Sequence, residues 1–172
     1  MEEVAPAVVW FDEIENAISR HHQDDTGVLD RIFGFFLTWM QEKQHPVFVV
    51  ATANNIDALP PEFLRKGRFD EIFFVDLPTA AEREVIWTLQ LKGRATSANG
   101  LNAVISNESA IDELVDLSDN HSGAEIEQAV ISALYEGFSG EGTVGLGTLR
   151  GVVEQMIPLA VTQAEEVLRI RN

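Results

Sequence analysis

The order of the apolar runs constrains the fold of this chain more than any other feature of its sequence. Three short runs of β-forming residues occur before residue 78, and none follows it. They are Ala7–Phe11 (AVVWF), Val47–Ala51 (VFVVA) and Ile72–Val75 (IFFV). An uninterrupted apolar run that ends at polar residues is typical of a strand buried on both faces of a parallel sheet. The pattern therefore predicts a parallel sheet in the first part of the chain.

Helical patterns separate the first two runs and take over after Pro78. Val28–Lys43 carries one apolar stripe and stops at His45-Pro46. Thr79, with Glu82 three residues on, forms a capping box for the next helix. The predicted helices lie at Glu13–Arg20, Val28–Lys43, Ala80–Lys92 (ended by Gly93), Glu108–Leu117, from Ser122 onward, Thr148–Ile157 and Pro158–Arg169, and the most irregular stretches are Arg20–Thr26, Ala95–Asn107 and Gly137–Gly147. We expect an α/β part over residues 1–78 and an all-α bundle over residues 79–172.

Charge and composition exclude several classes of protein. Lys and Arg total 12 against 28 Asp and Glu, a net charge of −16, which argues against nucleic acid or an anionic membrane as the partner. Apolar residues make up 45%, enough for a core, and the absence of Cys excludes disulfides and thiolate metal sites. No apolar stretch is long enough to span a bilayer, and the acidic N-terminus is unlike a signal peptide. We expect an intracellular protein, in the cytoplasm.

Polar side chains stand where the first two predicted strands end. Asp12 and Glu13 follow the first strand, and Asn54 follows the second. Open α/β sheets bind ligands at the carboxyl ends of their strands. An Asp there can hold Mg²⁺, a Glu can orient or deprotonate water, and an Asn can bond a phosphate oxygen. Taken singly, solvated acids and a turn Asn are the commoner interpretation.

Two further clusters contain residues that are suited to binding a ligand. Arg65, Lys66 and Arg68 crowd into one corner of an acidic chain, and the planar guanidinium fork matches phosphate oxygens. The segment from His121 through Gly123 and Ala124 places small residues at a helix start, where a backbone can approach a flat ligand. A surface turn and an ordinary helix cap are the simpler alternatives for these two clusters.

The order and spacing of these motifs together resemble the AAA-type ATPase module of the AAA+ superfamily. The resemblance runs from Ala7 to about Met156 and is strongest over ATANNIDALPPEFLRKGRFD, which looks like the second region of homology of that family. Within the family, the chain is similar to AAA proteins encoded in plastid and cyanobacterial genomes, and this similarity implies the plastid stroma as an alternative to the cytoplasm. The resemblance implies a truncated P-loop NTPase sheet followed by a helical lid.

The resemblance also implies a role for each motif. Asp12 and Glu13 match the Walker B pair, with Asp12 on Mg²⁺ and Glu13 activating water. Asn54 matches the sensor-1 residue that reads the γ-phosphate. Arg65 and Arg68 match the arginine fingers, which act on the ATP of a neighbouring subunit across a ring interface. The implied cofactors are ATP and Mg²⁺, and the implied partners are other AAA+ subunits and an unknown protein substrate.

The lid and the pore-facing loop are matched in the same way. His121, Gly123 and Ala124 match the segment that lines adenine and ribose. No sensor-2 Arg follows them, as in the AAA subgroup. Arg20–Thr26 would be the second pore-facing loop; its two His and two Asp allow a metal site, although a solvated loop is the simpler interpretation.

One element of the family is missing from the sequence. No G-x-x-x-x-G-K-[ST] motif occurs, and Gly140–Gly147 has no Lys-Ser/Thr after it and is interpreted as a lid turn. We expect Met1 to fall downstream of the start of the module. Without the Walker A nest and its Lys, the isolated chain should bind ATP poorly and hydrolyse it negligibly.

The missing loop also leaves a gap in the expected sheet. The family strand order is 5-1-4-3-2, and the three predicted strands correspond to strands 3, 4 and 5. The hypothesis that follows is direct pairing of VFVVA with IFFV, or dimerisation through these strands, because strand edges need partners. The lid bundle is nearly complete and should fold alone.

Three functions remain open at this point. The chain is part of an ATP-hydrolysing motor, or an interaction module that lends arginine fingers to intact partner subunits, or a helical scaffold with a relic sheet.

Overall fold

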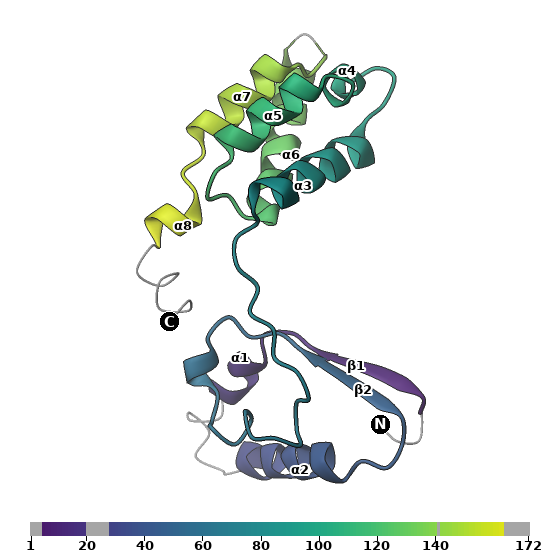
Figure 1. The fold of residues 1–172 in the computed structure, drawn as a ribbon, viewed down its shortest axis with the longest axis vertical. Coiled ribbons are helices and arrows are strands. Elements are labelled where there is room, and N and C mark those ends of the chain that lie inside the picture. The colour runs from purple at the N-terminus through teal and green to yellow at the C-terminus, as the bar shows by residue number, and fades with distance from the viewer. Residues whose placement is uncertain (1–4, 20–27, 141, 164–172) are drawn as a thin grey trace. The chain divides into compact units, whose positions relative to one another are not determined.

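The chain forms two compact units in its computed structural model. They comprise Met1–Phe74 and Val75–Asn172, and residues 5–19, 28–140 and 142–163 are described (Figure 1). The predicted pore-facing loop Arg20–Thr26, with its possible metal ligands, lies outside the described residues. Within the described ranges, no helix combines the length and the apolar character needed to cross a membrane.

The first unit is built on two parallel strands. β1 (Ala7–Phe11) pairs with β2 (Val47–Ala51) along its whole length, with Ala7 opposite Val47 and Phe11 opposite Ala51. The connection contains α1 (Ile14–Ser19) and α2 (Val28–Glu42), and the 3₁₀ turn η3 (Ile56–Ala58) follows β2. The parallel pair with its helical crossover confirms the predicted α/β architecture.

Only one face of this sheet is covered by described residues. The buried side chains Ile14 and Phe63 form a small core, against which pack Phe11, Phe36, Leu37, Ala51, Leu59 and Phe69. The side chains on the opposite face, Val8, Trp10, Phe48 and Val50, are exposed. The prediction that both strands are buried on both faces was therefore wrong for the described chain, because no described element covers that second face.

The predicted third strand was also wrong. Residues 72–75 have no regular secondary structure, and the side chains of all four are more than half exposed. A strand exists only where a neighbour completes its hydrogen-bond ladder, and β2 is paired with β1 rather than with this run. The hypothesis that VFVVA and IFFV pair directly is therefore overturned.

The second unit is entirely helical in its described part (Figure 1). Its helices are α3 (Ala80–Arg94), α4 (Leu101–Ile105), α5 (Glu108–Leu117), α6 (Gly123–Ser139), α7 (Leu146–Gln155) and α8 (Leu159–Thr162). The bounds of α5 match the prediction, and α3 runs past Gly93. The short α4 lies in the stretch predicted to be irregular, where the backbone carbonyl of Gly100 accepts from the Ala103 N–H.

Two capping boxes and one core organise this unit. Thr79 caps α3 with Glu82, and Ser122 caps α6 with Glu125, each pair bonded reciprocally. The core is formed by the fully buried Trp87, Leu91, Leu101, Leu114, Ile126, Ala129, Val130, Ala133 and Leu149, with further residues of all helices from α3 to α7 around them. This core lies wholly inside the second unit.

Candidate functional site

The ends of β1 and β2 are tied together by Thr52. The Thr52 N–H donates to the Phe11 carbonyl over 2.9 Å, and its own carbonyl accepts from the Ile14 N–H over 3.0 Å. The Thr52 hydroxyl donates to Asp12 Oδ1 over 2.6 Å and accepts from the Glu13 N–H over 3.0 Å. One hydroxyl therefore fixes the side chain of one acid and the backbone of the next.

The carboxylate of Glu13 is held by two amides. Asn54 Nδ2 donates to Oε1 over 3.1 Å, and Asn16 Nδ2 donates to Oε2 over 2.5 Å. Glu13 also has a positive φ of 49°, a conformation that non-glycine residues seldom adopt and that clusters at functional sites. The structure thus brings together Asp12, Glu13 and Asn54, three of the residues that the sequence singled out.

Glu15 is a buried acid that holds the backbone of Asn54. Its side chain is 6% exposed, and Oε1 accepts from the Asn54 N–H over 2.8 Å. Glu15 Oε2 is buried without a hydrogen-bond partner among the described residues. Sequence reasoning missed Thr52, Asn16 and Glu15; only the (i, i+3) spacing of Glu13 and Asn16 across a helix start could have signalled one of them.

The oxygen donors at this site fit a magnesium ion whose other ligands are phosphate oxygens and water. Asp12 and Thr52 offer a carboxylate and a hydroxyl, both exposed, and Mg²⁺ prefers oxygen ligands. In the described ranges no cluster of three or more His, Cys, Asp or Glu could hold a metal. Mg²⁺ at phosphate sites is commonly held by one or two carboxylates together with water and phosphate. The small number of protein donors found here is therefore typical of such a site.

Arg65 and Arg68 lie on the same loop but in different surroundings. The Arg65 side chain is 69% exposed, with Glu62 Oε1 3.8 Å from Nη2. Arg68 is half-buried, and its Nη1 donates to the Glu62 carbonyl. Gly67 between them has a φ of 91°, which glycine adopts without strain. Arg65 is thus available to an external anion, whereas one end of Arg68 is already engaged.

The remaining predicted residues belong to the second unit. His121 is 3% exposed, Gly123 is half-buried and Ala124 is exposed at the start of α6. His121 Nδ1 lies 3.1 Å from the Asp119 carbonyl, while Nε2 is buried with no hydrogen-bond partner in the described part of the chain. This segment belongs to the second unit, whereas Asp12, Glu13 and Asn54 belong to the first.

The carboxylate of Glu125 closes the turn after His121. Partial burial acts to raise the pKa of Glu125, but the Ser122 and Leu159 N–H groups, the Ser122 hydroxyl and the charge of His121 together lower it. The N–H of Leu159, at the start of α8, donates to Glu125 Oε1 over 2.8 Å. Glu125 therefore joins the N-terminus of α6 to the segment after α7.

Comparison with known proteins places this arrangement in a family. The family described as "ATPase family associated with various cellular activities (AAA)" matches residues 1–77. The AAA domain-containing protein ycf46 of Pyropia yezoensis is 46% identical over 168 residues, which are 96% of this chain and 32% of that protein. The chain belongs to the AAA family. Its resemblance to the AAA-type ATPase module is thereby confirmed, and the AAA proteins encoded in plastids are among its relatives.

Other AAA relatives extend the comparison. The ycf46 protein of Guillardia theta is 40% identical over 99% of this chain and 33% of that protein. The peroxisomal ATPase pex1 of Schizosaccharomyces pombe is 34% identical over 74% of this chain and 13% of that protein. The chain spans about a third of the length of the ycf46 proteins that it matches. AAA family members in general bind ATP with Mg²⁺ and assemble into oligomers.

Proposed function

We propose that this chain supplies the Walker B, sensor-1, arginine-finger and lid parts of an ATP-hydrolysing AAA+ motor. The observation that carries the proposal is the hydrogen-bonded cluster of Asp12, Thr52, Glu13 and Asn54 at the ends of paired parallel strands, in a chain of the AAA family. The chain, when it works within the motor, contributes acid, amide and guanidinium groups around a triphosphate.

Each residue has a defined part in the proposed reaction. Asp12, positioned by Thr52, would hold Mg²⁺, which neutralises charge on the phosphates when bound. Glu13 accepts a proton from the attacking water at the carboxylate that Asn54 and Asn16 orient. Arg65 and Arg68 would stabilise the transferring phosphoryl group of a neighbouring subunit, and His121, Gly123 and Ala124 would line the base and ribose.

The isolated chain should not perform this reaction. Its sequence lacks the G-x-x-x-x-G-K-[ST] motif whose backbone N–H groups and Lys cradle the phosphates. Titration of the chain with millimolar Mg·ATP is therefore expected to release no binding heat in a calorimeter. Saturable binding would contradict the proposal.

The test of the motor function uses the genomic sequence upstream of Met1. If a Walker A motif lies there in frame, the longer polypeptide should hydrolyse ATP, and Glu13→Gln should lower kcat by a factor of about 10² to 10⁴ while ATP still binds. Glu136→Gln, the same change at an acid of α6, serves as the control. Unchanged turnover in the Glu13 variant would refute the role assigned to this carboxylate.

A second function is favoured by the exposure of Arg65. A chain without Walker A could lend its arginine fingers to intact partner subunits. The chain would be added to the ycf46 AAA protein of Pyropia yezoensis, with ATP turnover as the readout. Turnover that rises with the wild-type chain and not with Arg65→Ala would support this function, and Lys66→Ala on the same loop is the matched control.

A further inference from the structure

We propose that Arg83 is a positioning residue for the loop that carries His121, and that it acts through Asp119. The inference rests on the proposed function only in that His121 is there assigned to the nucleotide. It concerns a buried arginine that no motif of the sequence pointed to.

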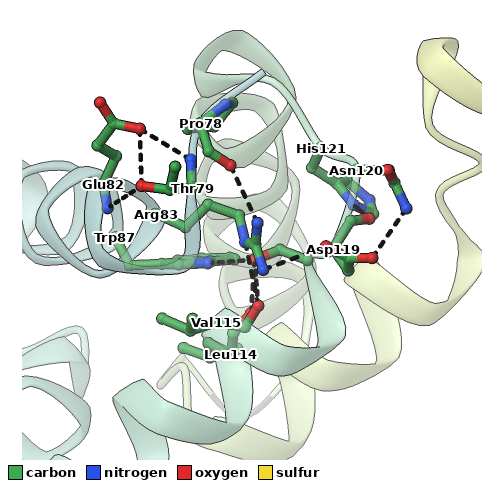
Figure 2. Close-up of polar contacts among 11 residues, drawn as sticks. Pro78, Thr79, Glu82, Arg83, Trp87, Leu114, Val115, Asp119, Asn120 and His121 are labelled. Atoms are coloured by element: carbon green, nitrogen blue, oxygen red, sulfur yellow. Dashed lines mark hydrogen bonds and ion pairs between the residues drawn. The ribbon is translucent and has the colours of Figure 1, made fainter. Parts of the chain in front are cut away.

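Arg83 joins three segments of the second unit. Its side chain, 9% exposed, ends in a guanidinium whose Nε donates to the Val115 carbonyl over 3.2 Å and whose Nη1 donates to the Pro78 carbonyl over 3.0 Å. Nη2 lies 3.3 Å from Asp119 Oδ1. Figure 2 shows the guanidinium between the entry to α3, the last turn of α5 and the loop before α6. The planar guanidinium holds its five donors in a fixed, spread fork, so Nε, Nη1 and Nη2 each reach a different acceptor, whereas an ammonium donates from a single nitrogen.

Asp119 contacts Arg83 and His121 through different groups. Its carboxylate pairs with Arg83, while its main-chain carbonyl lies 3.1 Å from His121 Nδ1 (Figure 2). A carbonyl oxygen can only accept, so this hydrogen bond requires the proton on Nδ1 and leaves Nε2 of the neutral ring as an acceptor. The orientation of Asp119 therefore determines which nitrogen of His121 carries the proton.

The backbone between these two residues leaves little freedom. Asn120 has a φ of 62°, and its Nδ2 donates to Asp119 Oδ2 over 2.9 Å. The His121 N–H donates to the Ser118 carbonyl over 3.1 Å. A tight turn of this kind transmits a rotation of Asp119 to His121, because the intervening residue is itself bonded to the carboxylate.

The contact with Asp119 can be separated from the structural role of Arg83. The two carbonyl acceptors, from Pro78 and Val115, keep the guanidinium hydrogen-bonded inside the unit, whereas Asp119 is 68% exposed at its side chain. Removing the charge of Asp119 therefore leaves the buried arginine with partners and the fold intact. Removing Arg83 takes a donor from the part-buried Pro78 carbonyl and from the Val115 carbonyl, which also accepts from the Ser118 hydroxyl over 3.2 Å, so such a variant tests folding as well as positioning.

The experiment measures the protonation pattern of His121 in the full chain. Asp119→Asn is compared with Asp116→Asn, which makes the same change of charge at an exposed acid of α5. The imidazole nitrogens are observed by ¹⁵N NMR at a pH where the ring is neutral. We expect the Nδ1–H form to predominate in the wild type and in Asp116→Asn, and a larger share of the Nε2–H form in Asp119→Asn. Several-fold faster amide exchange at His121 should accompany that shift.

Rescue and failure are defined by two further variants. Asp119→Glu restores the charge and should return the ring toward the Nδ1–H form, which a loop that needs only a polar residue would not do. Arg83→Lys should shift the ring in the same direction as Asp119→Asn. If Asp119→Asn leaves both the ring nitrogens and the amide exchange as in Asp116→Asn, Arg83 does not position His121.

The outcome is independent of the nucleotide role. The NMR readout needs no ATP, so it decides the positioning by itself. His121→Ala in the longer polypeptide, with the KM for ATP as readout, decides whether the positioned ring belongs to the nucleotide site. An unchanged KM there would overturn the assignment of His121 and leave the role of Arg83 standing.

Discussion

At the residue scale, Thr52 links the two acids of the candidate site. Its hydroxyl accepts from the Glu13 N–H and donates to Asp12 Oδ1, so a single oxygen fixes both the start of α1 and the direction of a carboxylate. Glu13 stays in a conformation with positive φ because its backbone and both carboxylate oxygens are held by neighbours. The hydrogen bonds of Thr52 and Glu13 therefore support one another.

Replacing Thr52 by Val should weaken this group of hydrogen bonds while the volume of the side chain stays nearly the same. The Glu13 N–H loses its acceptor, a loss of about 1 kcal/mol or a factor of about five in local opening. Amide exchange at Glu13, followed by mass spectrometry or NMR, should accelerate accordingly. Thr52→Ser retains the hydroxyl and should exchange at the wild-type rate; equal rates in all three proteins would show that the hydroxyl does not hold this backbone.

Glu125 gives the second unit an acid-sensitive contact. Its pKa is lowered in the folded chain because hydrogen bonds from Ser122 and Leu159 outweigh the effect of burial. A carboxylate whose pKa is lowered on folding stabilises the fold above its unfolded pKa of about 4.3, and this stabilisation is lost as the pH falls through the folded pKa.

Glu125→Gln tests this dependence. The urea midpoint of the second unit should be lower in the variant than in the wild type at about pH 6, and the difference should shrink toward about pH 3. Glu136→Gln, at an exposed acid of the same helix, changes the same charge without removing the cap. A difference between Glu125→Gln and the wild type that does not vary with pH would exclude the carboxylate as its cause.

At the scale of elements, the helices could be predicted better than the strands. A capping box and an apolar stripe are local signals, and both are present where α3 and α6 begin. A strand depends on a partner that the local sequence does not name. IFFV has the composition of a strand, yet residues 72–75 have no ladder partner in the described chain.

The residues of the candidate site also differ in whether the sequence could predict them. Asp12, Glu13 and Asn54 could be predicted because strand ends in a parallel sheet share one edge. Thr52 and Glu15 could not, since a hydroxyl two residues before Asn54 and a buried acid within α1 carry no distinctive pattern. Their roles follow from the register of β1 and β2, which sets Phe11 opposite Ala51. Arg83 was missed because its three partners come from separate segments.

The N-cap of α3 offers a test at the scale of one element. Thr79→Ala removes the hydroxyl that accepts from the Glu82 N–H and should destabilise the second unit by about 1 kcal/mol. Urea unfolding followed by helical circular dichroism measures this loss. Thr88→Ala lies within α3, where Ala favours helix, and should not destabilise the unit. A loss of the same size in both variants would show that the cap contributes nothing.

At the scale of the whole molecule, the two units differ in how they are stabilised. The second has a core of its own that draws residues from every helix between α3 and α7. The first has a smaller cluster around Ile14 and Phe63, and leaves Trp10 and Phe48 exposed on the uncovered sheet face. Folding cooperativity should therefore reside in the second unit, because among the described residues it buries the larger contiguous set of apolar side chains.

Residues 75–172 should consequently fold as a separate polypeptide. Trp87 is fully buried, with its Nε1–H donating to Ser118 Oγ over 2.9 Å, and it is the single Trp of this segment, so its fluorescence reports on this core alone. We expect one cooperative urea transition, with the midpoint that amide exchange at Trp87 gives in the full chain. Residues 1–74 alone should unfold without a sharp transition, or self-associate through the exposed sheet face. A second unit that unfolds gradually by itself, or at a much lower urea concentration, would mean that its stability depends on the first.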